Sequence, residues 1–133
     1  MKRFIRLIVL VMACVLVLAT LASCGKSLDS IKKKAEKAGY SVQAETLSEA
    51  DEDGVVAVVR IADPNAKSIY SGIATAYEFK DTDSAKKAYE GAQEELEKAK
   101  EAAAAMGMDT GAVVKRSGKI VILGAEEIVK KVW

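Results

Sequence analysis

The chain has 133 residues, with 20 lysines and arginines against 19 aspartates and glutamates, and it contains no histidine. Without histidine the chain lacks the commonest general base near neutral pH and the commonest metal ligand. The near-neutral charge does not favour nucleic-acid binding, which needs a basic surface. We therefore expect no nucleic acid and no cofactor as partners, and we expect that the protein is not an enzyme.

Residues 1–24 have the three-part composition of an export signal. Lys2, Arg3 and Arg6 precede twelve uninterrupted apolar residues at 7–18, and small residues follow. A membrane-spanning helix needs about 20 apolar residues. The apolar run and its extension, residues 7–22, end before Gly25 and Lys26, so a permanent helical anchor is the weaker alternative.

The end of this segment, Leu21, Ala22, Ser23 and Cys24, resembles the lipobox of bacterial lipoproteins: an aliphatic residue, two small residues and a cysteine. The resemblance implies that the Cys24 thiol receives a diacylglyceryl group and that a peptidase cuts between Ser23 and Cys24. It also implies attachment to the outer, extracytoplasmic face of a cell membrane through lipid on Cys24. The alternative is an ordinary secretory signal that leaves Cys24 as a lone free thiol, which is unusual in an exported protein.

Cleavage at this point divides the chain into a signal peptide at 1–23, a lipidated cysteine with a short tether at 24–27, and a domain at 28–133. The 110 residues left after cleavage are one ordinary domain. Such a domain can bury a core without disulfides. None is expected, because Cys14 leaves with the signal peptide.

The domain begins with a predicted helix at 28–38. Leu28, Ile31 and Ala35 lie on one helix face, with Ser27 as the N-cap and Gly39 as the stop. Predicted strands follow at 40–47, 55–62 and 71–80, on the evidence of alternating or β-branched apolar residues. Alternation in the third strand puts Ile73 and Tyr77 on one side, and we expect both in the core.

A long helix opens at Asp81 to Ser84, which supply capping oxygens and acidic charge at its start. Its apolar stripe runs from Ala85 through Leu96 and Ala99 to Met106, and we expect it to lie on the sheet. Two short strands at 112–116 and 119–123 form a hairpin, and a last helix covers 125–133. The sequence predicts an α+β fold: a mostly antiparallel sheet of about five strands with helices on one face, in the order α-β-β-β-α-β-β-α.

Two segments of the domain carry a second resemblance. Ala76-Tyr77-Glu78-Phe79 before Asp81, and Val114-Lys115-Arg116-Ser117-Gly118-Lys119 before an apolar strand, are similar to small uncharacterised lipoproteins of Gram-positive bacteria. This resemblance implies no activity. It leaves a non-enzymatic binding or interaction module, whose protein partner is unknown, as the first hypothesis. The alternatives are an accessory subunit of a membrane complex and a small enzyme of the cell envelope.

The candidate site residues form two sets. Lys32, Lys33, Lys34 and Lys37 on the first helix, with Lys26 on the tether, predict a basic patch facing anionic lipid. A solvated helix face diluted by Glu36 is the alternative. Glu49, Asp51 and Asp53 fall at positions 1, 3 and 5 of a calcium loop. Because Arg60 replaces the essential glutamate, a solvated acidic loop is the simpler interpretation and we expect no metal.

Overall fold

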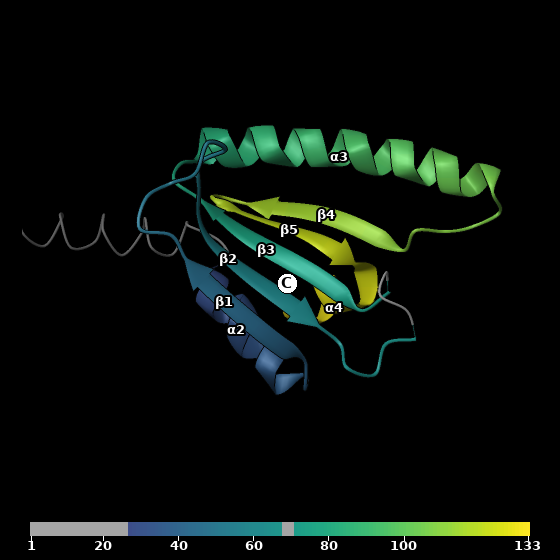
Figure 1. The fold of residues 1–133 in the computed structure, drawn as a ribbon, viewed down its shortest axis with the longest axis horizontal. Helices are drawn as coiled ribbons and strands as arrows, with labels where there is room; N and C mark the ends of the chain where they lie inside the picture. The colour runs from purple at the N-terminus through teal and green to yellow at the C-terminus, as the bar shows by residue number, and fades with distance from the viewer. Residues whose placement is uncertain (1–26, 68–70) are drawn as a thin grey trace, which may run out of the picture.

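The structure is a computed structural model that describes residues 27–67 and 71–133. Its five strands form one antiparallel sheet in the order β1-β2-β3-β5-β4 (Figure 1). The strands are β1 (Ser41–Thr46), β2 (Val55–Ala62), β3 (Ile73–Phe79), β4 (Ala112–Ser117) and β5 (Ile120–Ala125). The helices are α2 (Leu28–Lys37), α3 (Thr82–Ala105) and α4 (Glu126–Val132). The predicted fold class, strand number and element order are confirmed.

The larger core lies between the sheet and the pair α2 and α4. Ile31 and Ala35 of α2 pack with Ile128 and Val129 of α4 against buried side chains of β2, β3 and β5. The four most buried of the sheet residues there are Ile61, Ala74, Ala76 and Ile122. This cluster holds thirteen buried residues against five in the cluster on the other face, so it contributes the larger share of the apolar burial that stabilises the described part of the chain.

Helix α3 lies on the opposite face of the sheet, so the expectation that all helices share one face is wrong. Its first turns pack through Ala85 against Phe79 and Val121, in a second, smaller core cluster. The sheet accepts helices on both faces because successive residues of a strand point to opposite faces. Here both faces of β2, β3 and β5 are apolar.

The α3 stripe is much less buried than its periodicity predicts. Ala85 is the one fully buried residue of this helix, Leu96 is half-buried, and Met106 just beyond it is 71% exposed. A helix of 24 residues is about 36 Å long, whereas a strand of 6–8 residues spans about 20–27 Å. The helix therefore runs past the end of the sheet, as its free end in Figure 1 shows.

Ile73 is a second core prediction that is wrong. It shares the α3 face of β3 with Tyr77 and Phe79, but it lies at the start of the strand and is 45% exposed. Helix α3 contacts β3, β4 and β5 and starts beside the other end of β3, directly after Phe79. Ile73 is therefore left in the uncovered part of that face.

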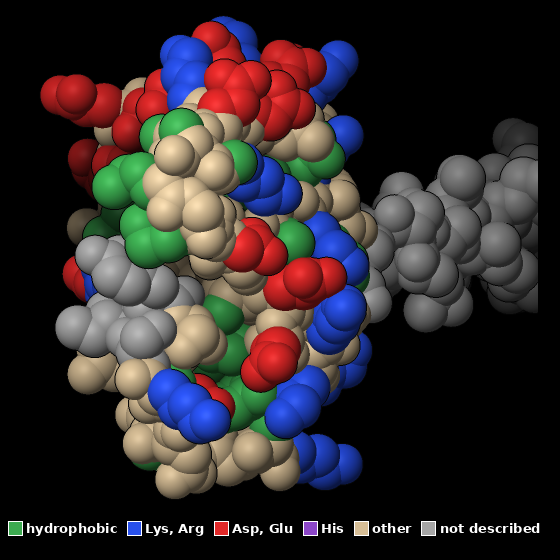
Figure 2. Space-filling view, turned by 90° about the vertical axis from the view of Figure 1, so that its right-hand side faces the viewer, with side chains coloured by type: hydrophobic (Ala, Val, Ile, Leu, Met, Phe, Trp, Pro, Cys, Tyr) green, Lys and Arg blue, Asp and Glu red, His purple; other side chains and the backbone are tan. Residues whose placement is uncertain are grey.

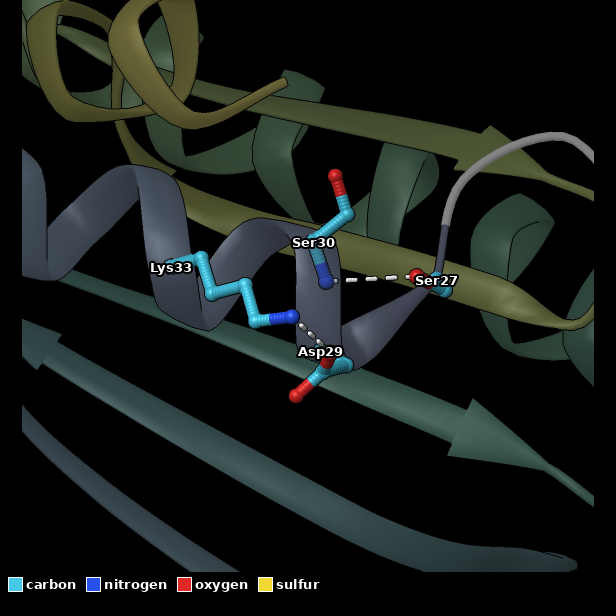
Figure 3. A network of polar contacts seen from close by, with 4 residues as sticks. All are labelled: Ser27, Asp29, Ser30 and Lys33. Atoms are coloured by element: carbon cyan, nitrogen blue, oxygen red, sulfur yellow. Dashed lines mark hydrogen bonds and ion pairs between the residues drawn. The ribbon is translucent and has the colours of Figure 1, made fainter.

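Local signals at the start of α2 act as predicted. The Ser27 hydroxyl oxygen accepts a hydrogen bond from the Ser30 amide at 3.2 Å, which caps the helix. One turn further, Lys33 pairs with Asp29 at 3.0 Å (Figure 3). The cap fixes the point at which α2 begins. No helix in the described residues is long and apolar enough to cross a membrane.

Candidate functional site

A groove of about 740 Å³ lies between α3, the sheet and the acidic turn at 51–54. It exists because α3 packs closely on the sheet through Ala85 while the rest of the uncovered β3 and β5 surface stays open. We call this feature the α3 groove. The residues that line it include Asp51, Asp53, Tyr77, Lys80, Lys87, Gly91 and Leu123.

The floor of the α3 groove is apolar and partly aromatic. The Tyr77 and Phe79 rings lie 6.4 Å apart between centroids and are tilted by 45°. Val121 is buried beside them, and Leu123 keeps 36% of its surface exposed. An exposed leucine next to a half-buried tyrosine offers both apolar area and a hydroxyl group to a ligand.

One wall of the α3 groove is lowered by a glycine in the middle of α3. A Cβ on Gly91 would meet nothing within 4 Å, so packing among the described residues does not require a glycine there. Glycine in a helix interior costs about 1 kcal/mol relative to alanine. Its consequence here is an open wall, because any larger side chain at this position would extend toward the groove.

The acidic turn forms the other wall, and its central carboxylate is used to hold the turn. Asp51 Oδ1 accepts hydrogen bonds from the amides of Asp53 (3.0 Å) and Val55 (2.8 Å). Gly54 completes the turn with φ +87°, a conformation that favours glycine. Glu49 and Asp53 are exposed to solvent. Within residues 27–67 and 71–133 no group of three possible ligand residues is placed to hold a metal ion.

The polar groups at the mouth are of both signs. Lys80 and Lys87 lie there beside Ser84 of the first turn of α3. The Ser84 amide donates to the Asp81 carboxylate at 2.7 Å, and this bond, followed by one from the Ser84 hydroxyl, holds the pKa of Asp81 below its usual value. This is a helix cap, so the carboxylate next to the groove has a structural role.

Of the α2 lysines predicted to form a membrane patch, Lys33, Lys34 and Lys37 line one surface hollow, together with the acids Asp29 and Glu36. Lys33, Lys34 and Lys37 are exposed, whereas Lys32 is half-buried. Successive residues of a helix are turned by about 100°, so Lys32 and Lys34 lie on opposite flanks. Lys34 faces α4, since its Nζ donates to the Trp133 carbonyl at 3.3 Å. Lys26 lies outside the described residues, as do Leu21, Ala22, Ser23 and Cys24.

The C-terminal end of α4 adds cations beside those of α2. The Lys131 ammonium lies 5.6 Å from the centroid of the Tyr40 ring, and a hydrogen bond to Tyr40 is the main cause that raises the pKa of Lys131. Lys130 is exposed next to it and pairs with Glu126 at 3.1 Å. The contacts of Lys34 with Trp133 and of Lys131 with Tyr40 therefore bring these two lysines, with Lys37 in the last turn of α2, toward the C-terminal end of α2.

Charge is distributed unevenly between the two faces. The α3 helix carries six acids against four lysines, and the turn at 49–53 adds four acids and no base. Helix α2 carries four lysines against Asp29 and Glu36. In Figure 2, lysine and arginine side chains stand along the right-hand side with acidic side chains among them, and acidic and basic side chains are mixed at the top.

Sequence reasoning missed both the α3 groove and the contribution of α4. A glycine inside a strongly helical stretch at Gly91, and the pair Lys130 and Lys131 at a helix end, were the signals available. Comparisons with protein-family models, curated proteins and solved structures find no match to this chain.

Proposed function

We propose that this protein is a lipid-anchored, extracytoplasmic binding module without catalytic activity of its own. The observation that carries the proposal is the position of the lipobox-like stretch relative to the fold. Cys24 follows the apolar run directly and stands three residues before Ser27, the cap of α2. A processed chain would thus consist of a lipid, two linking residues and the folded domain.

The α3 groove supports a binding role. It combines an apolar, partly aromatic floor with a few charged groups at its mouth, which is the usual composition of a site for non-covalent recognition. Its neighbouring carboxylates, Asp51 and Asp81, are engaged by backbone amides and hold the acidic turn and the start of α3 in place. The groove is therefore where we place partner binding.

The anchor is tested by expressing the full chain in a bacterial host and analysing the mature protein by mass spectrometry and detergent-phase partitioning. Wild-type protein is expected to begin at Cys24, to carry acyl mass and to enter the detergent phase. Cys24→Ala should stay unprocessed and lack the acyl mass. Ser23→Ala is the matched control, because it keeps a small residue before the cysteine. Isolation of wild-type protein with a free Cys24 thiol would overturn the proposal.

An accessory subunit of a membrane complex is a second candidate, favoured by one observation. Met106 is 71% exposed and Met108 is 58% exposed, at the end of α3 that extends past the sheet. Exposed large apolar side chains gathered in one place often mark a protein contact. A photo-crosslinking residue at position 106 should yield one discrete adduct in intact membranes if this role holds. The same residue at Glu101, an exposed polar position, is the control.

A further inference from the structure

We propose that the common face of α2 and α4 is the surface that this domain lays on an anionic membrane, with Trp133 at headgroup level and the α3 groove turned to the aqueous side. The inference rests on the proposed lipid anchor and goes beyond it by assigning the face and the orientation. It also replaces a patch on α2 alone by a composite surface of two helices that are distant in sequence.

The segment between the lipidated cysteine and helix α2 is short. Cys24 and Ser27 are three residues apart, and an extended chain covers at most about 3.6 Å per residue, so the start of α2 lies within about 11 Å of the lipidated cysteine. Helix α2 is about 15 Å long. The tether is therefore short enough to hold α2 at the bilayer surface, and a helix that lies along this surface brings every one of its turns close to the lipid.

Some lysines of this face have no acidic side chain as a partner. Lys33 pairs with Asp29 and Lys130 with Glu126, whereas no Asp or Glu side chain of the described ranges forms an ion pair with Lys34, Lys37 or Lys131. Lys34 donates instead to the Trp133 main-chain oxygen. Asp63 and Glu127 act on Lys131 from a greater distance, and Glu36 lines the same surface hollow as Lys34 and Lys37, where it offsets part of their charge. The three lysines gather at the end of the helical face that is furthest from the tether.

Lipid at one end of α2 and three lysines at the other give two separated points of attachment. A single lipid anchor leaves a domain free to swing, while a second electrostatic contact fixes one face against the surface. Each basic residue near an anionic bilayer changes partitioning about five-fold, so the three together contribute about a hundred-fold at low salt. That contribution is lost as salt shortens the Debye length.

Two aromatic residues lie beside the lysines of this face. Trp133 receives the Lys34 hydrogen bond through its carbonyl, and Tyr40 lies beneath Lys131. Tryptophan and tyrosine are favoured at the headgroup level, where one part of the ring is apolar and another is polar. An anionic membrane repels the excess negative charge of α3 and the turn at 49–53. This repulsion favours the orientation in which that face is turned away from the membrane.

Trp133 is the one tryptophan in the sequence, so its fluorescence reports on this face. The test uses the full, acylated protein in vesicles of phosphatidylcholine with or without 30% phosphatidylglycerol, part of the lipid carrying bromine near the headgroups as a quencher. We expect quenching of Trp133 in anionic vesicles at low salt, and at least a three-fold loss of quenching at 0.5 M salt. Acyl mass and flotation are measured on the same samples.

The triple variant Lys34→Gln, Lys37→Gln and Lys131→Gln should stay acylated and float, yet lose the quenching. The matched control changes the same charge on the opposite face, through Lys86→Gln, Lys87→Gln and Lys100→Gln, and should keep it. A missing acyl mass would show that the anchor is wrong. Acylated, floating protein with equal Trp133 quenching in both kinds of vesicle would overturn the assigned face. The salt series on wild-type protein decides the matter if the triple variant fails to fold.

Discussion

Gly124 of β5 lies directly against Ala74 of β3. The two residues are partners in the β3–β5 ladder, and a Cβ built on Gly124 would stand 2.3 Å from the Ala74 Cα and 2.5 Å from the Ile73 carbonyl oxygen. Gly124 also has φ +155°. Only glycine fits at this position of the inner strand β5, because the neighbouring strand occupies the space that a side chain would need.

Gly124→Ala should lower the free energy of unfolding by about 3 kcal/mol, since the added methyl group forces the backbone of β3 to shift. Urea unfolding followed by circular dichroism measures the change. Gly91→Ala is the control: its Cβ meets nothing within 4 Å, so it should stabilise the protein by about 0.5–1 kcal/mol. Equal effects of the two substitutions would contradict the packing described for Gly124.

Two isoleucines of the sheet should respond very differently to truncation. Ile122 is fully buried beneath α2 and α4, so Ile122→Ala should cost about 2–5 kcal/mol. Ile73 is 45% exposed, and Ile73→Ala should cost less than about 1 kcal/mol. Thermal and urea unfolding of both variants measure these costs. A larger loss at Ile73 than at Ile122 would show that the uncovered face of β3 is packed in solution.

The cap of α3 should make stability depend on pH. Hydrogen bonds from Ser84 lower the pKa of Asp81 below its ordinary value of 3.8, so the folded protein binds this proton less tightly than the unfolded chain does. The stabilisation is therefore fully present above about pH 4 and is lost as the pH falls through the lowered pKa. Asp81→Asn keeps a capping oxygen without a titratable proton.

The difference in unfolding free energy between wild-type protein and Asp81→Asn should shrink between pH 6 and pH 2. Asp83→Asn, in the first turn of the same helix, serves as a control for the change in net charge. Parallel pH profiles for wild-type protein and Asp81→Asn would show that the Asp81 carboxylate does not hold this cap in solution.

The α3 groove should bind an apolar anionic dye such as 1-anilinonaphthalene-8-sulfonate weakly, through its apolar floor and Lys87. Gly91→Leu should reduce this binding at least five-fold, because the leucine side chain extends into the open wall. Gly91→Ala should keep it, since a methyl group occupies little of the space. Unchanged dye binding in Gly91→Leu would mean that the dye binds elsewhere and that the groove is closed in solution.

Local signals in the sequence predicted the elements well because they act over a few residues. The predicted strand 55–62 is β2 as observed, and the first helix ends at Lys37, one residue before its predicted end. The hairpin was also predicted, although its turn is centred on Gly118 and Lys119 and the strands extend to Ser117 and Ala125.

Features that depend on how distant elements meet were not predictable from the pattern. Alternation in β3 separates Ala74 from Tyr77, but it does not say which helix covers which side. The α3 groove depends on the close contact at Ala85 and on the bulge between Val55 and Ala57, which keeps Val55 and Val58 on one face. The lysines at one end of the helical face come together only because α2 and α4 lie side by side. The contact between Lys34 and Trp133 shows this packing, and it cannot be read from the sequence.

The position of β5 between β3 and β4 has a consequence for the order of folding. The ladders β1–β2, β2–β3 and β4–β5 join neighbours in the chain, whereas β3–β5 joins residues 42–50 positions apart, with α3 between them. Closing that loop costs chain entropy before any of its contacts form. We therefore expect the three-stranded meander and the hairpin to form first, and their docking along β3 and β5 to be the slowest step in completing the core.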